Sequence, residues 1–159
     1  MSPEIRLTIE PFSAWRREAE PLFRAHWEEI ARHREQVPLD PDWQRYQALE
    51  DGGVLFAVTM RRAWRLVGYL TYLVAPHLHY RSLVVGAQDM IYVAPEHRRG
   101  GFGYCALVRF GDEALRERGV HLTFQRDKAA YPLEAVYRRL HYAPAIERTH
   151  ERVLQWPSI

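Results

Sequence analysis

The chain has 159 residues, 47% of them hydrophobic and 13% aromatic, which suffices for the core of one globular domain over residues 1–159. Its net charge of +2 mixes both signs and gives no concentrated basic face for nucleic acids, and with no apolar run long enough to cross a membrane and no leader-like start we expect a cytoplasmic protein. Because Cys105 is the only cysteine, an intrachain disulfide and a cysteine-rich zinc site are excluded, and we expect no metal.

The N-terminal third is predicted to hold one strand and two helices. Residues 5–9 have the pattern of a short strand, and residues 13–33 have a helical pattern. A second helix follows, with Asp40 as its cap and the glycine pair at 52–53 as its stop. The apolar face of the first helix consists of Leu22, Phe23, His26, Trp27 and Ile30.

Three strands are predicted next. Residues 54–60 and 65–74 are apolar on both faces and are joined by a short basic turn, so they belong in the centre of a sheet. A longer strand covers residues 82–93, and Gly86 marks a place where a bulge is tolerated.

The second half alternates helices and strands. A helix is predicted over 101–118, a strand over 120–125, a helix from Pro132, and one or two further strands in the tail, 142–156. The order predicts a mixed α/β fold with early antiparallel hairpins and a later strand–helix–strand crossover. The inward residues of the first of these helices are predicted to be Phe102, Ala106, Phe110 and Ala114, with Leu107 and Leu115 alongside. Those of the second are Leu133, Val136, Tyr137 and Leu140.

A glycine-rich turn, "HRRGGFG", separates the long strand from the helix that follows it. Glycines in such a turn let backbone N–H groups at a positive helix end approach an anion, above all a phosphate. Neither the P-loop nor the dinucleotide-binding glycine pattern is present, so a turn without a ligand is the alternative.

This turn carries a resemblance to a known family. Residues 98–103 match the pattern [Q/R]-x-x-G-x-[G/A] of the GNAT superfamily of N-acetyltransferases, and "IYVAPEHRRGGFG" and "EAVYRRLHYAP" are similar to that family's fourth strand and late helix. The resemblance implies the GNAT fold, a mixed and mostly antiparallel sheet of 6–7 strands with about four helices. The segments "HxHYRS" and "HWEEIARHR" are similar to uncharacterised phage and prophage members.

The resemblance also implies an acetyl-CoA site. The strand backbone at the matching positions would pair with the pantetheine arm, and the loop would hold the pyrophosphate. The residues implied for the arm are Ile91, Tyr92 and Val93, and those implied for the pyrophosphate are Arg98, Arg99, Gly100, Gly101, Phe102, Gly103 and Tyr104.

Asp89 is the candidate general base. Strict alternation places it on the face of Leu83, Val85, Ala87, Ile91 and Val93, where desolvation would raise its pKa. It would take the proton of an attacking amine, directly or through water. A core Asp paired with an Arg is the alternative, and a β-bulge would change the face that it occupies.

Tyr137 is the candidate acid, because it matches the family tyrosine that protonates or hydrogen-bonds the CoA thiolate. A plain core role is the alternative, since it lies on the apolar stripe of its helix. The asparagine that many members carry seven residues earlier is Ala130 here, which leaves Lys128 or backbone groups to compensate.

The acceptor is expected to bind beside the first two helices and the hairpin before residue 82. Trp27, Glu28, His79 and Tyr80 are the candidate substrate-binding residues, because acidic and aromatic groups suit a cationic amine. A solvated helix face is the alternative interpretation.

Three functions remain open from the sequence. The first is an N-acetyltransferase that moves acetyl from acetyl-CoA to a small primary amine by direct attack in a ternary complex. The second is an acetyltransferase for a protein or a modified nucleic acid. The third is a non-catalytic CoA-binding module, and a homodimer is compatible with each of them.

Overall fold

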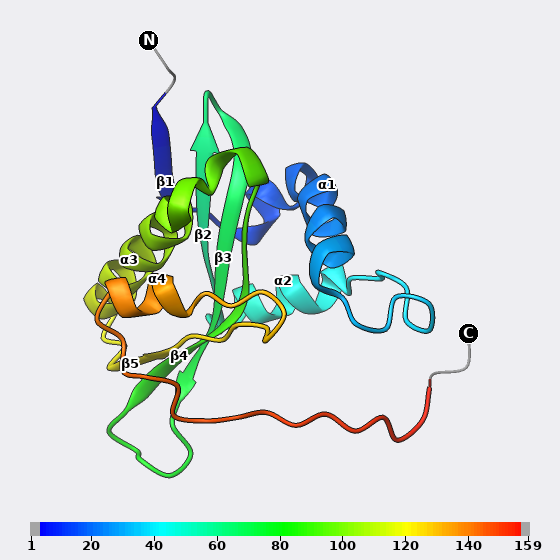
Figure 1. Ribbon diagram of the computed structural model, residues 1–159. Helices are drawn as coiled ribbons and strands as arrows, with labels where there is room; N and C mark the ends of the chain where they lie inside the picture. The colour runs from blue at the N-terminus through cyan, green and yellow to red at the C-terminus, as the bar shows by residue number, and fades with distance from the viewer. Residues whose placement is uncertain (1–3, 157–159) are drawn as a thin grey trace.

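Figure 1 shows the computed structural model, which describes residues 4–156. The ends of the predicted 1–159 domain, residues 1–3 and 157–159, lie outside the described residues. The elements in chain order are β1 (Ile5–Ile9), α1 (Phe12–Ile30), α2 (Trp43–Asp51), β2 (Leu55–Arg62), β3 (Arg65–Pro76), β4 (Val84–Val93), α3 (Phe102–Glu117), β5 (Leu122–Phe124) and α4 (Glu134–Arg139).

The strands form one sheet in the order β1-β2-β3-β4-β5. The first three pairings are antiparallel, and β4 pairs with β5 in parallel across the α3 crossover. This confirms the predicted mixed α/β class, the hairpins and the crossover. The two strands that are apolar on both faces, β2 and β3, lie inside the sheet as their composition predicts.

The sheet separates two cores. One face packs against α1 and α2 through an aromatic cluster that includes Phe12, Trp15 and Tyr69. The other face packs against α3 and α4 through aliphatic residues that include Leu107 and Leu115. Most of the buried residues on the α1 side are therefore aromatic, whereas those on the α3 side are mainly aliphatic, with Phe56 and Tyr72 as the buried aromatic residues.

The N-terminus of α2 differs from the prediction. Asp42 is the cap, since its Oδ1 accepts the N–H of Arg45 at 2.9 Å, and the helix begins at Trp43 rather than at Asp40. The segment "DPD" offers two acidic caps two residues apart, and the second is the one that reaches a helical N–H. The end of α2 before Gly52 is confirmed.

The buried stripe of α3 agrees with the prediction at Leu107, Ala114 and Leu115 and differs from it at the start of the helix. Gly103, Leu107, Gly111 and Leu115 are buried, whereas Phe102 is 69% exposed. A Cβ on Gly111 would lie 3.1 Å from the Tyr72 ring, so glycine lets the helix approach β3 closely. Gly103 and Gly111 were not predicted to face the sheet, because they have no apolar side chain to mark them.

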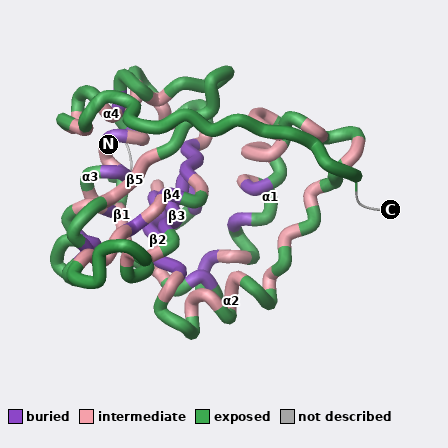
Figure 2. Tube along the Cα trace, turned by 90° about the horizontal axis from the view of Figure 1, so that it is seen from below, coloured by how far each residue is buried: buried purple, intermediate pink, exposed green. Residues whose placement is uncertain are grey.

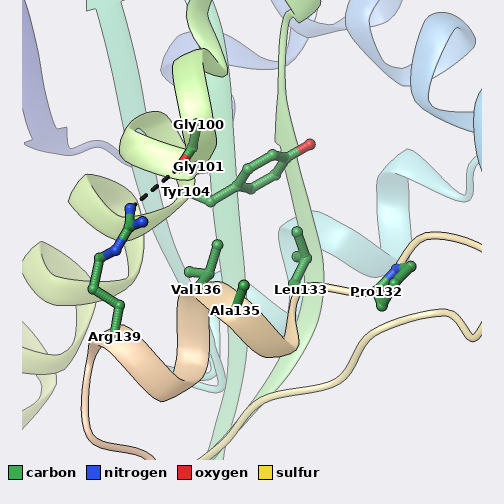
Figure 3. Close-up of a pocket in the computed structure, with 8 residues that line it drawn as sticks. All are labelled: Gly100, Gly101, Tyr104, Pro132, Leu133, Ala135, Val136 and Arg139. Carbon is green, nitrogen blue, oxygen red and sulfur yellow. Dashed lines mark hydrogen bonds between the residues drawn. The ribbon is translucent and has the colours of Figure 1, made fainter.

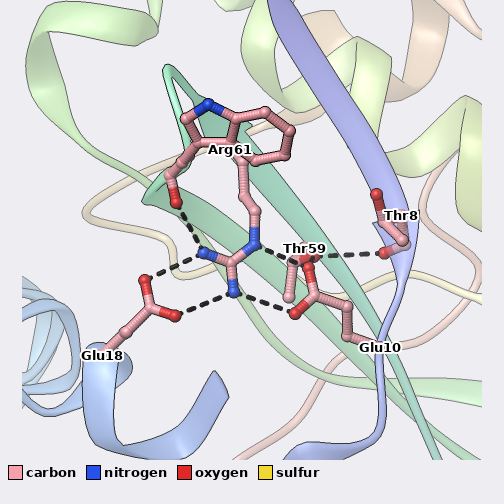
Figure 4. Close-up of polar contacts among 6 residues, drawn as sticks. Thr8, Glu10, Glu18, Thr59 and Arg61 are labelled. Atoms are coloured by element: carbon pink, nitrogen blue, oxygen red, sulfur yellow. Dashed lines mark hydrogen bonds and ion pairs between the residues drawn. The ribbon is translucent and has the colours of Figure 1, made fainter. Parts of the chain in front are cut away.

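A charged cluster fixes the start of the chain to the sheet (Figure 4). The Arg61 guanidinium on β2 donates to both carboxylate oxygens of Glu10 and to both of Glu18 on α1, at 2.7–3.0 Å. Its remaining contact is the Trp64 carbonyl at 2.8 Å, and Thr59 donates to Glu10. Because the guanidinium is only 14% exposed, these partners offset the cost of its desolvation.

The tail does not form the predicted further strands. The described residues from 143 to 156 contain no strand, so the sheet has five strands over residues 4–156 instead of 6–7. The tail instead runs to the end of α1, where Glu151 pairs with Arg32 and His33 (Figure 1). Figure 2 shows it exposed along its length. None of the helices in the described range is sufficiently long and apolar to cross a membrane.

Candidate active site

A β-bulge in β4 organises the site. Thr71 of β3 lies opposite Met90 and Tyr72 lies opposite Gln88, so Asp89 is the extra residue between them. The Thr71 hydroxyl stabilises the bulge, because it accepts the N–H of Met90 at 3.1 Å and donates to Asp89 Oδ2 at 3.3 Å. Gln88 and Asp89 lie on opposite faces of the sheet, as neighbours in a strand do, and the bulge places Asp89 and Met90 on the same face.

Strict alternation predicted that Asp89 shares the face of Ile91 and Val93, and the bulge makes this prediction wrong. Its carboxylate lies on the α1 side, bonded to Thr71 and close enough to Tyr46 of α2 to influence the titration of that residue. Burial raises the pKa of Asp89, while the Thr71 hydrogen bond and the Arg126 charge lower it by less. The predicted rise in the pKa of Asp89 agrees with this environment, whereas the predicted face of the sheet was wrong.

The bulge does not lie at Gly86, the position at which the sequence analysis allowed one. A Cβ on Gly86 would lie 3.2 Å from Leu115 Cδ1, so this glycine serves the packing of α3 against β4.

Tyr137 of α4 lies on the opposite face and is tied to Gln88. Its hydroxyl is 3.1 Å from both Gln88 Oε1 and the Arg126 carbonyl, and it has one proton to donate to them. The Gln88 amide also bonds both backbone groups of Arg126, at 3.0 and 3.1 Å. Burial, with Asp127 as the next cause, raises the pKa of Tyr137 and keeps the hydroxyl protonated.

Beyond this point β4 and β5 separate. Their pairing ends at Ala87 and Phe124, and the second half of β4 has a strand neighbour only on its β3 side. The N–H of Ala94 donates to the carbonyl of Val67 on β3 at 2.8 Å. Because backbone groups of successive residues point to opposite edges of a strand, the N–H and C=O groups of Ile91 and Val93 point toward the open edge. The edge can therefore take an extended chain with amide groups, as a further strand would.

The glycine turn adjoins this edge. Gly100 and Gly101 have φ values of +60° and +84°, and Gly101 precedes α3 without a side-chain cap. A Cβ on Gly103 would lie 2.7 Å from the His97 carbonyl oxygen, so only glycine fits there. Gly100 and Gly101 thus leave the backbone just before α3 without side chains, which suits the approach of an anion to this helix start.

A cavity of about 260 Å³ lies between this turn and α4 (Figure 3), and we call it the α4 pocket. Arg139 donates to the Gly100 carbonyl at 3.2 Å and links α4 to the turn. The lining fits an anionic ligand with an apolar arm, because glycine backbone lies on one wall and apolar side chains on the other. The pocket is lined by Gly100, Gly101, Tyr104, Pro132, Leu133, Ala135, Val136 and Arg139.

Arg98 points away from the turn that it opens. Its guanidinium holds Glu29 of α1 through two bonds of 2.9 and 2.6 Å, and its Nε donates to the Val93 carbonyl at 2.7 Å. It also lies over the Tyr92 ring, 5.3 Å from its centre. Arg98 therefore links α1 to the open edge of β4 in this structure.

A second cavity, of about 420 Å³, lies beside α1, and we call it the α1 pocket. His26 contributes its ring, which bonds the Tyr69 hydroxyl at 2.8 Å through Nδ1 and stacks on Tyr92. Burial lowers the pKa of His26 to about 4, so the imidazole is neutral at pH 7. The pocket is lined by Phe23, His26, Trp27, Ile30, Ala31, Val37, Pro38, Leu39, Asp40, Pro41, Tyr46, Met90 and Lys128.

The four predicted substrate-binding residues divide between two places. Trp27 lines the α1 pocket, whereas Glu28 next to it is exposed. His79 and Tyr80 lie in the exposed turn between β3 and β4, which contributes no residue to this pocket. Two predicted loop residues, Arg99 and Phe102, are exposed as well. Over residues 4–156 no group of three metal-ligating side chains comes together.

The sequence analysis missed Thr71, Gln88, the walls that α4 contributes and the 37–39 segment. A polar Gln88–Asp89 pair inside an apolar strand was the one available signal for the first two. The others are ordinary apolar residues whose positions depend on tertiary packing.

Comparison with known proteins bears on what these pockets hold. The sequence profile described as the Acetyltransferase (GNAT) family matches residues 12–142. Among curated proteins no sequence matches significantly.

Several solved structures share the fold. Ribosomal-protein-alanine N-acetyltransferase from Brucella melitensis biovar Abortus has 20% identity and a TM-score of 0.73, covering 98% of this chain and 99% of that one. An aminoglycoside acetyltransferase from an uncultured soil metagenomic sample, in complex with sisomicin, has 15% identity and a TM-score of 0.72, covering 96% and 97%. A predicted acetyltransferase with acetyl-CoA from Clostridium acetobutylicum has 14% identity and a TM-score of 0.67, covering 95% and 97%.

The family match covers far more than half of the chain and contains β4, the glycine turn and α4. The predicted family is therefore confirmed, and with it the predicted use of acetyl-CoA. This chain belongs to the Acetyltransferase (GNAT) family and is an acetyl-CoA-dependent acyltransferase.

Proposed function

We propose that the protein is an N-acetyltransferase that moves acetyl from acetyl-CoA to a primary amine by direct attack in a ternary complex. The observation that carries this proposal is the bulge at Asp89. It leaves Asp89 on the α1 face beside Met90, which lines the α1 pocket, while Gln88 lies with Tyr137 on the opposite face. A base on the acceptor side and an acid on the donor side are what direct transfer needs.

The donor would lie along the open edge of β4 and across the glycine turn. Ile91 and Val93 offer backbone groups to the pantetheine amides, and the first turn of α3 offers N–H groups to the pyrophosphate. When bound, acetyl-CoA supplies the activated acyl group. Arg98 would have to release the Val93 carbonyl for the arm to use it.

Asp89 would take the proton of the amine, directly or through a water molecule. An alkyl amine is mostly protonated at neutral pH, so it needs such a base before it attacks. The raised pKa of Asp89 brings it closer to the operating pH than an exposed carboxylate. The Thr71 hydrogen bond would hold the carboxylate toward the amine.

Tyr137 would donate its proton or a hydrogen bond to the departing sulfur. Its raised pKa keeps the phenol protonated at neutral pH, as a donor must be. Gln88 would position the hydroxyl and hold β5 at the point where the two strands separate. The backbone N–H of Ile91, which points to the open edge, would polarise the acyl carbonyl.

The relatives support an amine acceptor without fixing it. The printed names of two of them specify a ribosomal protein alanine and aminoglycosides, so this fold serves both macromolecular and small amines. The α1 pocket favours the small ones, since 420 Å³ lies in the range of small-ligand pockets.

The test begins with acetyl-CoA alone, which should raise the melting temperature. A panel of amines should then release free thiol. Asp89→Asn and Tyr137→Phe should each lower kcat by about 100-fold. Both should retain the acetyl-CoA-induced rise in melting temperature.

The matched controls, Asp51→Asn and Tyr131→Phe, lie outside both pockets and should keep the wild-type rate. Unchanged rates in both site variants would remove the assigned roles. No thermal response to millimolar acetyl-CoA would contradict the donor site.

A further inference from the structure

We propose that the acceptor is a small monoamine with an apolar body, an aryl or branched alkyl group, that binds in the α1 pocket. The inference rests on the proposed function, since it names the substrate of that reaction. It follows from the walls of the pocket, its charges and the presence in its lining of Met90, the residue after Asp89.

The walls are apolar on three sides. Trp27 and Ile30 come from α1, Val37 to Leu39 come from the segment after it, and Met90 comes from β4. Val37 is 40% exposed without a ligand, so an apolar group in the pocket would remove hydrophobic surface from water. A polar or highly hydrated acceptor would gain nothing from these walls.

The charges suit one ammonium group and oppose several. Asp40 is the one carboxylate of the lining, and Lys128 adds a positive charge. An aminoglycoside or a polyamine would leave further ammonium groups against apolar walls and near Lys128. His26 adds no charge, because its Nδ1 bonds the buried Tyr69 hydroxyl and its neutral form prevails at pH 7.

The amine end of the ligand is defined by the bulge. Met90 lines the pocket and directly follows Asp89, and the hydroxyl of Tyr46, also in the lining, lies 3.7 Å from the Met90 sulfur. An amine whose body fills the pocket would thus direct its nitrogen to Asp89 and the open edge of β4.

The α1 wall of the pocket is supported by stacked rings. Phe23 stacks on Trp43 with ring centres 5.5 Å apart, and His26 stacks on Tyr92 at 5.0 Å. Phe23, Trp43 and Tyr92 belong to the α1-side core, so this wall is packed before a ligand arrives. A preformed apolar site selects by shape as well as by charge.

The experiment compares kcat/KM by thiol release for 2-phenylethylamine, isoamylamine, 1,5-diaminopentane, kanamycin and a peptide with an N-terminal alanine. The two monoamines should exceed the diamine and kanamycin by about tenfold or more. Preference for the diamine, kanamycin or the peptide would overturn the inference and leave the proposed function standing.

Val37→Asp should shift the ratio of monoamine to diamine by about tenfold toward the diamine, because it adds a carboxylate to the wall. The matched control is Leu78→Asp in the turn between β3 and β4, where Leu78 is 97% exposed, and it should leave the ratio unchanged. An equal shift in both variants would contradict the pocket.

A binding measurement separates the two failures. Tryptophan fluorescence of the protein without donor should respond to 2-phenylethylamine and not to 1,5-diaminopentane, through Trp27 in the pocket wall. A response without any thiol release would support the pocket and contradict the proposed function. No response and no turnover would overturn both.

Discussion

The two pockets on either side of β4 are built from different materials. The α4 pocket is bordered by glycine backbone and by α4, whereas the α1 pocket is bordered by large side chains from α1, the 37–41 segment, Tyr46, Met90 and Lys128. A site made of backbone leaves a local signature in the sequence, because glycine must stand at fixed places. A site made of side chains from distant segments leaves none. The glycine turn was therefore visible in the sequence and its resemblance to the family implied the donor, whereas nothing in the sequence marked the acceptor pocket.

The largest effect should come from adding carbon on the backbone-built side. In Gly103→Val the new Cβ would lie 2.7 Å from the His97 carbonyl oxygen and 2.9 Å from Val93 Cγ1, and neither neighbour can move freely. We expect a loss of about 3 kcal/mol in the free energy of unfolding, measured in urea, and loss of the thermal response to acetyl-CoA.

The comparison variant is Ala31→Val in the wall of the α1 pocket. It adds two carbons on the side-chain-built side and should preserve both stability and the acetyl-CoA response. If Gly103→Val were as stable as wild type, the close packing of α3 on β4 would be refuted.

The next effect is a pH dependence that belongs to the α1 side. Since burial lowers the pKa of His26 from 6.5 to about 4, the unfolded chain binds a proton more readily than the folded protein. The contribution of His26 is present above pH 6.5 and is lost as the pH falls toward 4, with an upper bound of roughly 3 kcal/mol.

Urea denaturation between pH 7 and pH 4 measures this loss. His26→Gln keeps a polar partner for Tyr69 and cannot take a proton, so its stability should fall less over the same range than that of wild type. Parallel curves for the two proteins would contradict the assignment.

A smaller effect separates two reasons for glycine in the turn. Gly100 has a φ of +60°, yet a Cβ there would meet no atom within 4 Å. Gly100→Val should cost about 1.5 kcal/mol through backbone strain, while Gly100→Asn, which tolerates this conformation, should cost less than about 0.5 kcal/mol. Equal costs for the two variants would show that space, rather than φ, decides the position.

The smallest effect concerns the contact that joins the two sides. The side chains of Arg98 and Glu29 are 27% and 25% exposed, so their ion pair with two hydrogen bonds should contribute roughly 1 kcal/mol after solvent screening. A double-mutant cycle with Arg98→Met and Glu29→Gln measures this coupling, which should shrink in high salt. A zero coupling at low salt would mean that α1 is held independently of the turn.

The parts of the fold that were predicted correctly depend on local signals. β1, the β2–β3 hairpin, the glycine turn and the stop of α2 follow from periodicity and from glycine positions within a few residues. The apolar face of α4 was correct for the same reason, since Val136 is buried and Leu133, Tyr137 and Leu140 pack beside it.

The face of Asp89 was not predictable in this way. The residue pattern of β4 gives no sign of a bulge. The bulge is stabilised in the structure by the hydroxyl of Thr71, which lies eighteen residues before Asp89 in the chain. The tail failed for a related reason. Its pattern allows a strand, but a strand needs a partner edge, and the tail contacts α1 instead.

The bulge has a consequence for the register of the sheet. Before it, Gly86 and Gln88 face α3 and α4, and after it Ile91 and Val93 do so. Removing Asp89 would therefore restore a regular strand and leave every other side chain of β4 on the face that it occupies now. The carboxylate is an addition to the packed sheet rather than one of the positions that the two cores need.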